Sequence, residues 1–259
     1  MVHHQSIPHP QARVSSTLRG PDQSRVVPTK NYRPPDIGLG HTSTERECAT
    51  YGAGDGTPTV FLHGWAPHRS YQRALFRLAR NGASVYAPRL PRSIAAQTFR
   101  SIDITRLSDY VRWLGDFLTA IGIDTPFTLV GHSVGGAIAI RTAYEIPDRV
   151  AKLVLVNSLG GARERQFRPQ DCRPSSVVAT ARDLTQELQY LAARQLPVAL
   201  LWGRSDRVIP RSSYLSLRNA LGGPPVFTVA GSHNWVIDDP HCFGFAMRTV
   251  MNASIGRAA

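Results

Sequence analysis

Lysine and cysteine are scarce in this 259-residue sequence, and it contains no long apolar segment. All but two of its 30 basic side chains are arginine, the exceptions being Lys30 and Lys152. The formal net charge of +12 therefore comes from arginines scattered along the chain, which argues against a phosphate-binding face for nucleic acid. No apolar run approaches the roughly 18 residues that a membrane-spanning helix needs, so we expect no membrane span.

The three cysteines, Cys48, Cys172 and Cys242, form no Cys-x-x-Cys pair and are odd in number. We therefore expect a reduced, cytoplasmic protein. The N-terminus lacks a positively charged start followed by an apolar segment, so we expect no signal peptide.

Two regions differ in composition. Residues 1–44 are rich in proline and arginine without an apolar repeat, and we expect a flexible tail there. In residues 45–259, short apolar runs alternate with amphipathic stretches. Strands are predicted at 45–51, 59–62, 83–87, 127–130, 150–156, 197–202 and 226–229. Helices are predicted at 71–80, 108–121, 134–145, 177–196, 213–221 and 241–251. This alternation predicts an α/β domain with a parallel sheet covered on both faces.

Ser133 lies in a Gly-x-Ser-x-Gly pattern between the strand predicted at 127–130 and the helix predicted at 134–145. A strand that leads directly into a helix forces the turn residue into a strained conformation and holds its hydroxyl clear of the sheet. Only residues without bulk fit two places before and after this corner, which explains Gly131 and Gly135. The pattern predicts that Ser133 is a nucleophile.

A serine hydroxyl needs a base within hydrogen-bond reach and an acid that orients the base. Asp206 follows the strand predicted at 197–202 and is expected at the same edge of the sheet as Ser133, so it is the predicted acid. Asp238 and Asp239 are weaker alternatives because no strand leads into them.

His233 is the predicted base because it follows the strand at 226–229 and a Gly-Ser turn. The three residues then occur in the chain order serine, aspartate, histidine. His63 and His132 flank strand ends, and we expect them to be structural.

The negative oxygen of a tetrahedral intermediate needs backbone N–H donors that are already in place. One is expected from Val134, the residue after the nucleophile, at the start of its helix. The other is expected from Trp65, in the loop after the strand at 59–62. Only the backbone N–H of Trp65 is required, so its side chain is free to serve as a packing group as well.

Four landmarks resemble, in order, those of the α/β-hydrolase superfamily and its serine esterase and lipase-like branch. They are His63-Gly64-Trp65, residues 131–136, residues 202–206 and Gly231-Ser232-His233. The resemblance covers residues 45–259 and implies an eight-stranded, mostly parallel sheet with helices on both faces. It also implies an acyl-enzyme mechanism, no cofactor and no metal, and a short cap over the substrate at about 159–195.

The chain departs from the family pattern after the strand at 83–87. Members often carry Asp-x-x-Gly-x-Gly there, whereas this chain has Arg89-Leu90-Pro91-Arg92. The short cap suggests an open or shallow site. Serine at position 133 argues against epoxide hydrolases and haloalkane dehalogenases, which use a carboxylate, and against dienelactone-type hydrolases, which use a cysteine.

The resulting hypothesis is a serine hydrolase acting on a small-molecule carboxylic ester or thioester. The alternatives are a lyase or cofactor-free oxygenase that uses the same three side chains, and a non-catalytic ligand-binding protein. Arginines in the expected cap favour an anionic substrate if they face the pocket, and otherwise form a solvated surface. These arginines are Arg163, Arg165, Arg168 and Arg173.

Overall fold

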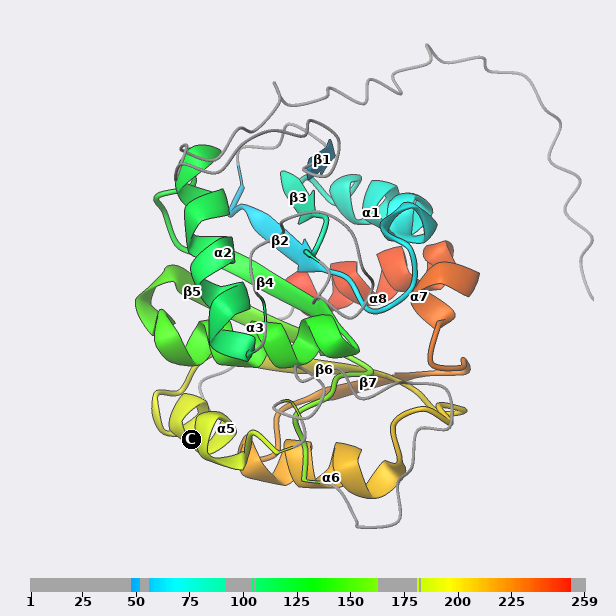
Figure 1. Cartoon of the computed structure of the whole chain (residues 1–259). Helices are drawn as coiled ribbons and strands as arrows, with labels where there is room; N and C mark the ends of the chain where they lie inside the picture. The colour runs from blue at the N-terminus through cyan, green and yellow to red at the C-terminus, as the bar shows by residue number, and fades with distance from the viewer. Residues whose placement is uncertain are drawn as a thin grey trace, which may run out of the picture.

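A computed structural model describes residues 48–51, 56–91, 104, 106–162, 181 and 183–252, and a central sheet organises them (Figure 1). Seven strands of the described residues form this sheet in the order β1-β3-β2-β4-β5-β6-β7. The strands are β1 (Cys48–Tyr51), β2 (Thr59–Leu62), β3 (Val85–Pro88), β4 (Phe127–His132), β5 (Val150–Val156), β6 (Val198–Gly203) and β7 (Val226–Val229). Only the pairing of β1 with β3 is antiparallel. The mostly parallel sheet is confirmed, and the count of eight strands stays a prediction.

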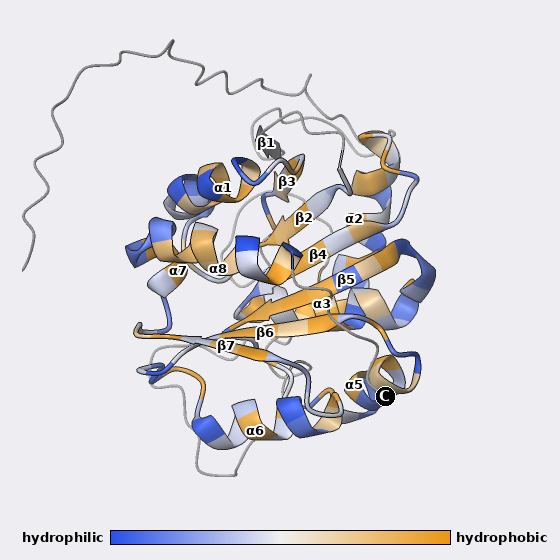
Figure 2. Ribbon diagram, turned by 180° about the vertical axis from the view of Figure 1, so that it is seen from behind, coloured by the Kyte–Doolittle hydropathy of each residue, from blue (hydrophilic) through white to orange (hydrophobic). Residues whose placement is uncertain are grey.

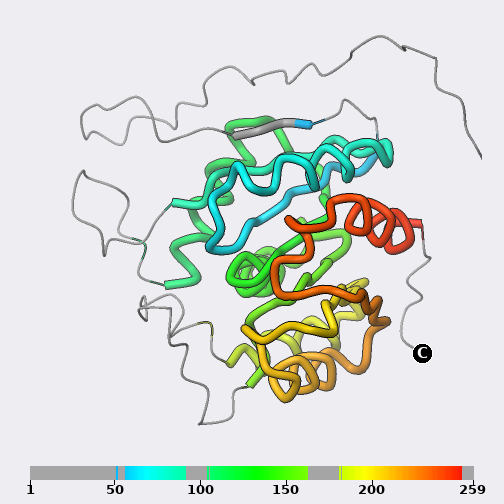
Figure 3. Tube along the Cα trace, turned by 90° about the vertical axis from the view of Figure 1, so that its right-hand side faces the viewer, coloured from blue at the N-terminus to red at the C-terminus, as the bar shows by residue number. Residues whose placement is uncertain are grey.

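Helices cover both faces of the sheet. The helices are α1 (Gln72–Ala79), α2 (Leu107–Ala120), α3 (Val134–Glu145), α5 (Thr185–Ala193), α6 (Arg211–Ala220), α7 (Trp235–Asp238) and α8 (Pro240–Asn252), with 3-10 turns η1 (His68–Tyr71) and η2 (Pro147–Arg149). Helices α2, α3, α5 and α6 share one apolar cluster with the sheet, and α1, α7 and α8 share the other. Figure 3 shows α8, in red, returning beside α1, in cyan, although the two are far apart in sequence.

The strands are apolar on both sides because each side meets one of these helix layers. In β5, Leu153 and Leu155 belong to the first cluster, while Val154 and Val156 belong to the second. Figure 2 shows the same strands as the most hydrophobic part of the ribbon. Burial on both faces explains why these strands appear in the sequence as continuous apolar runs rather than as alternating patterns.

Four elements have the bounds predicted from the sequence: β2, α3, β5 and β7. The single helix predicted over 177–196 was wrong, because Asp183 and Leu184 are not helical and α5 begins at Thr185. Residues 177–180 and 182 of that prediction lie outside the described residues. The Asp183 carboxylate accepts the N–H of Thr185, an amide that no helix carbonyl can reach, and the Leu184 N–H binds the Gly160 carbonyl. Both contacts set the start of the helix.

Some predictions lie outside the described residues, namely the tail at 1–44, the four cap arginines and Cys172. Helix α7 was not predicted, because four residues are too few for a helical period to be visible. No helix in the described parts of the chain is long and apolar enough to cross a membrane.

Candidate active site

Ser133 forms the turn between β4 and α3, with φ 57° and ψ −120°. A residue other than glycine rarely adopts this positive φ, so the turn depends on close packing around Ser133. A Cβ added to Gly131 would lie 2.5 Å from the Gly135 carbonyl oxygen, and one added to Gly135 would lie 2.2 Å from the Leu62 carbonyl oxygen. Backbone therefore packs against backbone at this corner, and both positions need glycine.

The structure brings the three predicted catalytic side chains together. The His233 Nε2 atom lies 3.0 Å from Ser133 Oγ, and His233 Nδ1 lies 2.9 Å from Asp206 Oδ2. They come from the carboxyl ends of β4, β6 and β7, which share one edge of the parallel sheet. The alternative acids make other contacts: Asp238 accepts from the Ser232 hydroxyl, and Asp239 accepts the Cys242 N–H.

The Asp206 carboxylate receives four hydrogen bonds. Its Oδ1 atom accepts the N–H groups of Val208 (2.8 Å) and Ile209 (3.0 Å), and Oδ2 accepts from His233 and from the side-chain amide of Asn157. Burial raises the pKa of Asp206, but the hydrogen bond and the charge interaction with His233, together with the hydrogen bonds from Asn157 and Ile209, outweigh burial and lower this pKa overall. The carboxylate is therefore held in its charged form.

Asn157 was missed in the sequence, although it follows β5 at the same edge of the sheet. It is fully buried with φ 41°, and its Oδ1 accepts the Gly203 N–H (3.1 Å) and the Trp235 Nε1–H (2.7 Å). Because both donors require the oxygen, the amide nitrogen must face Asp206. The available signal was a polar residue directly after a buried strand, as for Ser133.

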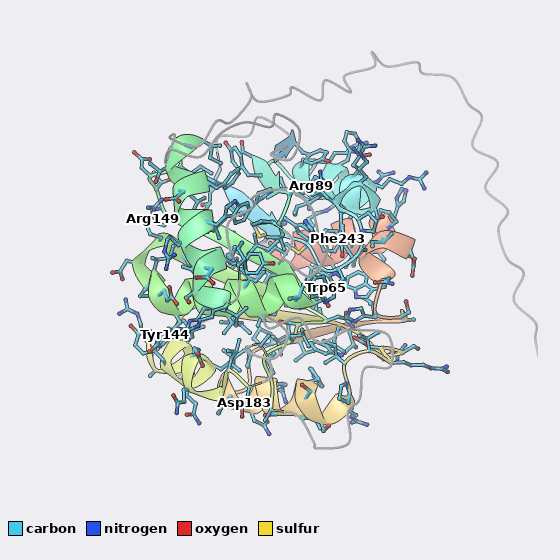
Figure 4. The ribbon with its side chains drawn as sticks, in the orientation of Figure 1. Trp65, Arg89, Tyr144, Arg149, Asp183 and Phe243 are labelled. Carbon is cyan, nitrogen blue, oxygen red and sulfur yellow. The ribbon has the colours of Figure 1, made fainter. Side chains whose placement is uncertain are left out.

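The two predicted oxyanion donors lie beside Ser133. Val134 begins α3, and a Cβ added to Gly64 would lie 3.1 Å from the Ser133 Cβ, so the loop that carries Trp65 touches the turn. Figure 4 shows Trp65 near the end of α3 where that helix starts, and its side chain is half exposed. Among the described residues, no acceptor receives a hydrogen bond from the N–H of Trp65 or of Val134. Within this described part of the chain, both N–H groups are therefore available as donors.

His63 holds the peptide that links Gly64 to Trp65. Its Nε2 atom accepts the Leu90 N–H (3.0 Å), so its proton lies on Nδ1, which donates to the Gly64 carbonyl (2.7 Å). That carbonyl and the Trp65 N–H belong to one planar peptide. Fixing the carbonyl therefore also fixes the direction of the N–H. Within the described residues, no three His, Cys, Asp or Glu side chains gather where they could share a metal ion.

Comparisons with known proteins find sequences similar to this chain. The sequence model of the alpha/beta hydrolase family matches residues 59–182. A pimeloyl-[acyl-carrier protein] methyl ester esterase of Nitrosomonas europaea is 29% identical over 147 residues, covering 55% of this chain and 55% of that protein. A 2-hydroxy-6-oxo-6-phenylhexa-2,4-dienoate hydrolase of Comamonas testosteroni is 26% identical over 163 residues, covering 60% of this chain and 53% of that protein.

The fold also matches solved structures. The thioesterase domain from the curacin biosynthetic pathway superposes with a TM-score of 0.60 at 17% identity, covering 78% of this chain and 94% of that domain. The sheet, the strand-turn-helix around Ser133 and these matches define an α/β-hydrolase fold. The chain is therefore similar to the α/β-hydrolase superfamily in sequence over residues 59–182 and in fold. It spans about half the length of the two curated relatives above.

Proposed function

We propose that this protein is a serine hydrolase that cleaves a carboxylic ester or thioester through an acyl-enzyme on Ser133. The observation that carries the proposal is the hydrogen-bonded chain from Ser133 Oγ through His233 to Asp206. The names of an esterase and a thioesterase among the similar proteins support the choice of bond.

In the acylation step, Ser133 Oγ attacks the acyl carbon while His233 Nε2 accepts the hydroxyl proton. A C–O bond forms, and the carbonyl electron pair moves onto the oxygen, where the N–H groups of Trp65 and Val134 stabilise the charge. Asp206 stabilises the imidazolium through Nδ1–H. The intermediate then collapses, and the alcohol or thiol leaves with the proton from His233.

In the deacylation step, a water molecule gives a proton to His233 and attacks the acyl carbon. A second oxyanion forms and is stabilised by the same two N–H groups. Its collapse breaks the bond to Oγ, Ser133 regains its proton from His233, and the carboxylic acid departs. Which acyl group is accepted depends on the loops that border the turn at Ser133. A preference for anionic substrates would require the cap arginines to face this turn.

The direct test is active-site labelling with a fluorophosphonate, followed by a chain-length series of p-nitrophenyl esters. We expect one label per chain, mapped to Ser133. With unlabelled protein, we expect a burst of about one p-nitrophenol per site that the fluorophosphonate can label. Ser133→Ala should lower turnover by at least about 10³-fold. Ser212→Ala, on α6, is the control and should label as the unmodified protein does.

Wild-type turnover by Ser133→Ala would overturn the proposal. A lyase or oxygenase that uses the same side chains would give no burst. Equal rates with charged and neutral acyl esters would overturn an anionic preference alone.

A further inference from the structure

A buried hydrogen-bond chain behind Ser133 connects three segments of the site without using any side chain of the proposed triad. The Gly64 N–H donates to the Tyr71 hydroxyl (3.1 Å), which lies 2.8 Å from Nδ1 of His132. Nε2 of His132 lies 3.0 Å from the main-chain carbonyl oxygen of His233. The chain therefore runs from the loop of Trp65, through the residue before Ser133, to the backbone of the proposed base.

The proton positions in this chain follow from its two ends. The His233 carbonyl can only accept, so Nε2 of His132 carries the proton and donates it. Nδ1 of the neutral ring is then an acceptor, and the Tyr71 hydroxyl must donate to it. The Tyr71 oxygen remains free to accept the Gly64 N–H. The position of every proton in the chain is thus fixed, and all the donors point in one direction, from Gly64 to His233.

Burial keeps both ring systems in these states. Tyr71 is fully buried and His132 is almost fully buried. Burial, reinforced by the neighbouring His233, lowers the pKa of His132 to about 3, and burial raises the pKa of Tyr71 to about 12. Neither group changes charge near neutral pH, which suits a fixed support rather than a proton carrier.

Gly64 is where this chain meets the proposed nucleophile. A Cβ added to Gly64 would lie 3.1 Å from His132 Nδ1, from the Tyr71 hydroxyl and from the Ser133 Cβ. Its N–H is held by Tyr71 and its carbonyl by His63, so the residue is anchored on both sides. The next N–H along the chain is that of Trp65.

We propose that Tyr71 and His132 are positioning residues that hold the His233 backbone and the Gly64–Trp65 peptide in a fixed position relative to Ser133. This role rests on the proposed function. Neither side chain touches substrate. Their contribution is to keep the base and one oxyanion donor within the narrow tolerance that acyl transfer requires, where a displacement of about 1 Å costs on the order of 10²-fold in rate.

The first test is Tyr71→Phe, which removes only the hydroxyl and retains the ring that packs against Phe61. We expect kcat to fall about 10- to 100-fold with KM within twofold, because the loss concerns alignment in the transition state. Fluorophosphonate labelling of Ser133 should slow in parallel. Tyr110→Phe is the matched control, since Tyr110 is also buried and donates one hydrogen bond, to the Pro91 carbonyl (2.9 Å). It should lower the melting temperature comparably and leave kcat within twofold.

The second test distinguishes the hydrogen bond of His132 Nδ1 from that of Nε2. The amide nitrogen of glutamine reaches about as far as Nε2, and that of asparagine about as far as Nδ1. His132→Gln should therefore keep the hydrogen bond to the His233 carbonyl and retain more activity than His132→Asn. Adding Tyr71→Phe to His132→Asn should cost less than the product of the two separate losses, because both substitutions break one network.

The outcomes of these tests are distinct. Unchanged kcat in Tyr71→Phe, with Ser133 still labelled, would overturn the positioning role and leave the proposed hydrolase intact. Equal losses in Tyr71→Phe and Tyr110→Phe would also overturn it, because the effect would then be one of stability. Wild-type protein that neither labels nor turns over esters would remove the proposed function, and this role with it.

Discussion

The side-chain amide of Asn157 donates a hydrogen bond to Oδ2 of Asp206, the same oxygen that accepts the Nδ1–H of His233. Asn157 also accepts the N–H groups of Gly203 and Trp235, so one buried side chain joins the ends of β5 and β6 to α7. The orientation of the Asp206 carboxylate thus depends on a residue outside the proposed triad. Such outer hydrogen bonds keep a reacting group in place, and their loss should affect both stability and rate.

Removing the Asn157 side chain should therefore weaken both properties. For Asn157→Gly, we expect the free energy of unfolding to fall by about 1–3 kcal/mol, because buried donors lose their acceptor, and kcat to fall about tenfold. Asn157→Ala should be less stable than Asn157→Gly by a further ~1 kcal/mol, because φ is 41°. Urea unfolding and ester turnover measure both quantities. Asn219→Ala, exposed on α6, is the control, and an Asn157→Gly variant as stable and active as the control would contradict this account.

The lowered pKa of Asp206 predicts a stability change in acid. Because the folded protein binds this proton less tightly than the unfolded chain does, the ionised carboxylate stabilises the fold above the unfolded value of about 3.8. That stabilisation is lost as the pH falls through the lower, folded pKa. Asp206→Asn should therefore show a shallower loss of unfolding free energy below about pH 4 than the wild type. Urea titrations from pH 5 to about pH 2 would test this, and parallel curves for the two proteins would refute it.

His132 predicts a second acid-sensitive window at higher pH. Its pKa falls from 6.5 to about 3 on folding, with burial as the largest cause. Between these values the unfolded chain binds a proton that the folded protein does not, so stability decreases as the pH is lowered from 6.5 towards 3. The slope from this group is at most about 1.4 kcal/mol per pH unit.

His132→Gln removes the titrating ring. The stability curve of this variant should be flatter than that of the wild type across the same window, whatever its stability at neutral pH. Chemical unfolding at half-unit pH steps provides the measurement. A slope that does not change on substitution would assign the acid sensitivity to other groups.

The glycine positions allow a paired test of the turn around Ser133. Gly135→Ala would place a Cβ 2.2 Å from the Leu62 carbonyl oxygen, a contact that only a backbone shift relieves. We expect a loss of at least about 2 kcal/mol in unfolding free energy, together with slow labelling of Ser133.

Gly115→Ala is the matched control, because Gly115 lies inside α2 and an added Cβ there meets nothing within 4 Å. This substitution should stabilise the protein by about 0.5–1 kcal/mol through helix propensity. Both effects can be read from urea unfolding curves. Similar changes in the two variants would show that packing at Gly135 is not the cause.

Much of the sheet could be predicted because its strands are short, apolar and separated by helices. Burial on both faces leaves a strong local signal, and for β2 and β5 the predicted bounds are those of the structure. The bounds of β7, an edge strand that is only partly buried, were also predicted correctly. Boundaries failed where a tertiary contact sets them. Helix α5 begins at Thr185 because Asp183 and Gly160 bind the backbone there, although the apolar pattern extends further towards the N-terminus. Helix propensity and apolar periodicity are local properties of the sequence, so they do not reveal such a contact.

Chain order alone was enough to place Ser133, Asp206 and His233 at one edge, since parallel strands present their carboxyl ends together. The bonds that hold this arrangement required the folded molecule. Tyr71 and His132 are 61 positions apart, and Asn157 and Asp206 are 49 apart. The short segments over which sequence patterns are evaluated therefore contain neither pair. The hydrogen-bond partner of each polar group depends on burial. In the close-packed interior water is excluded, so a polar group must bond to another group of the protein.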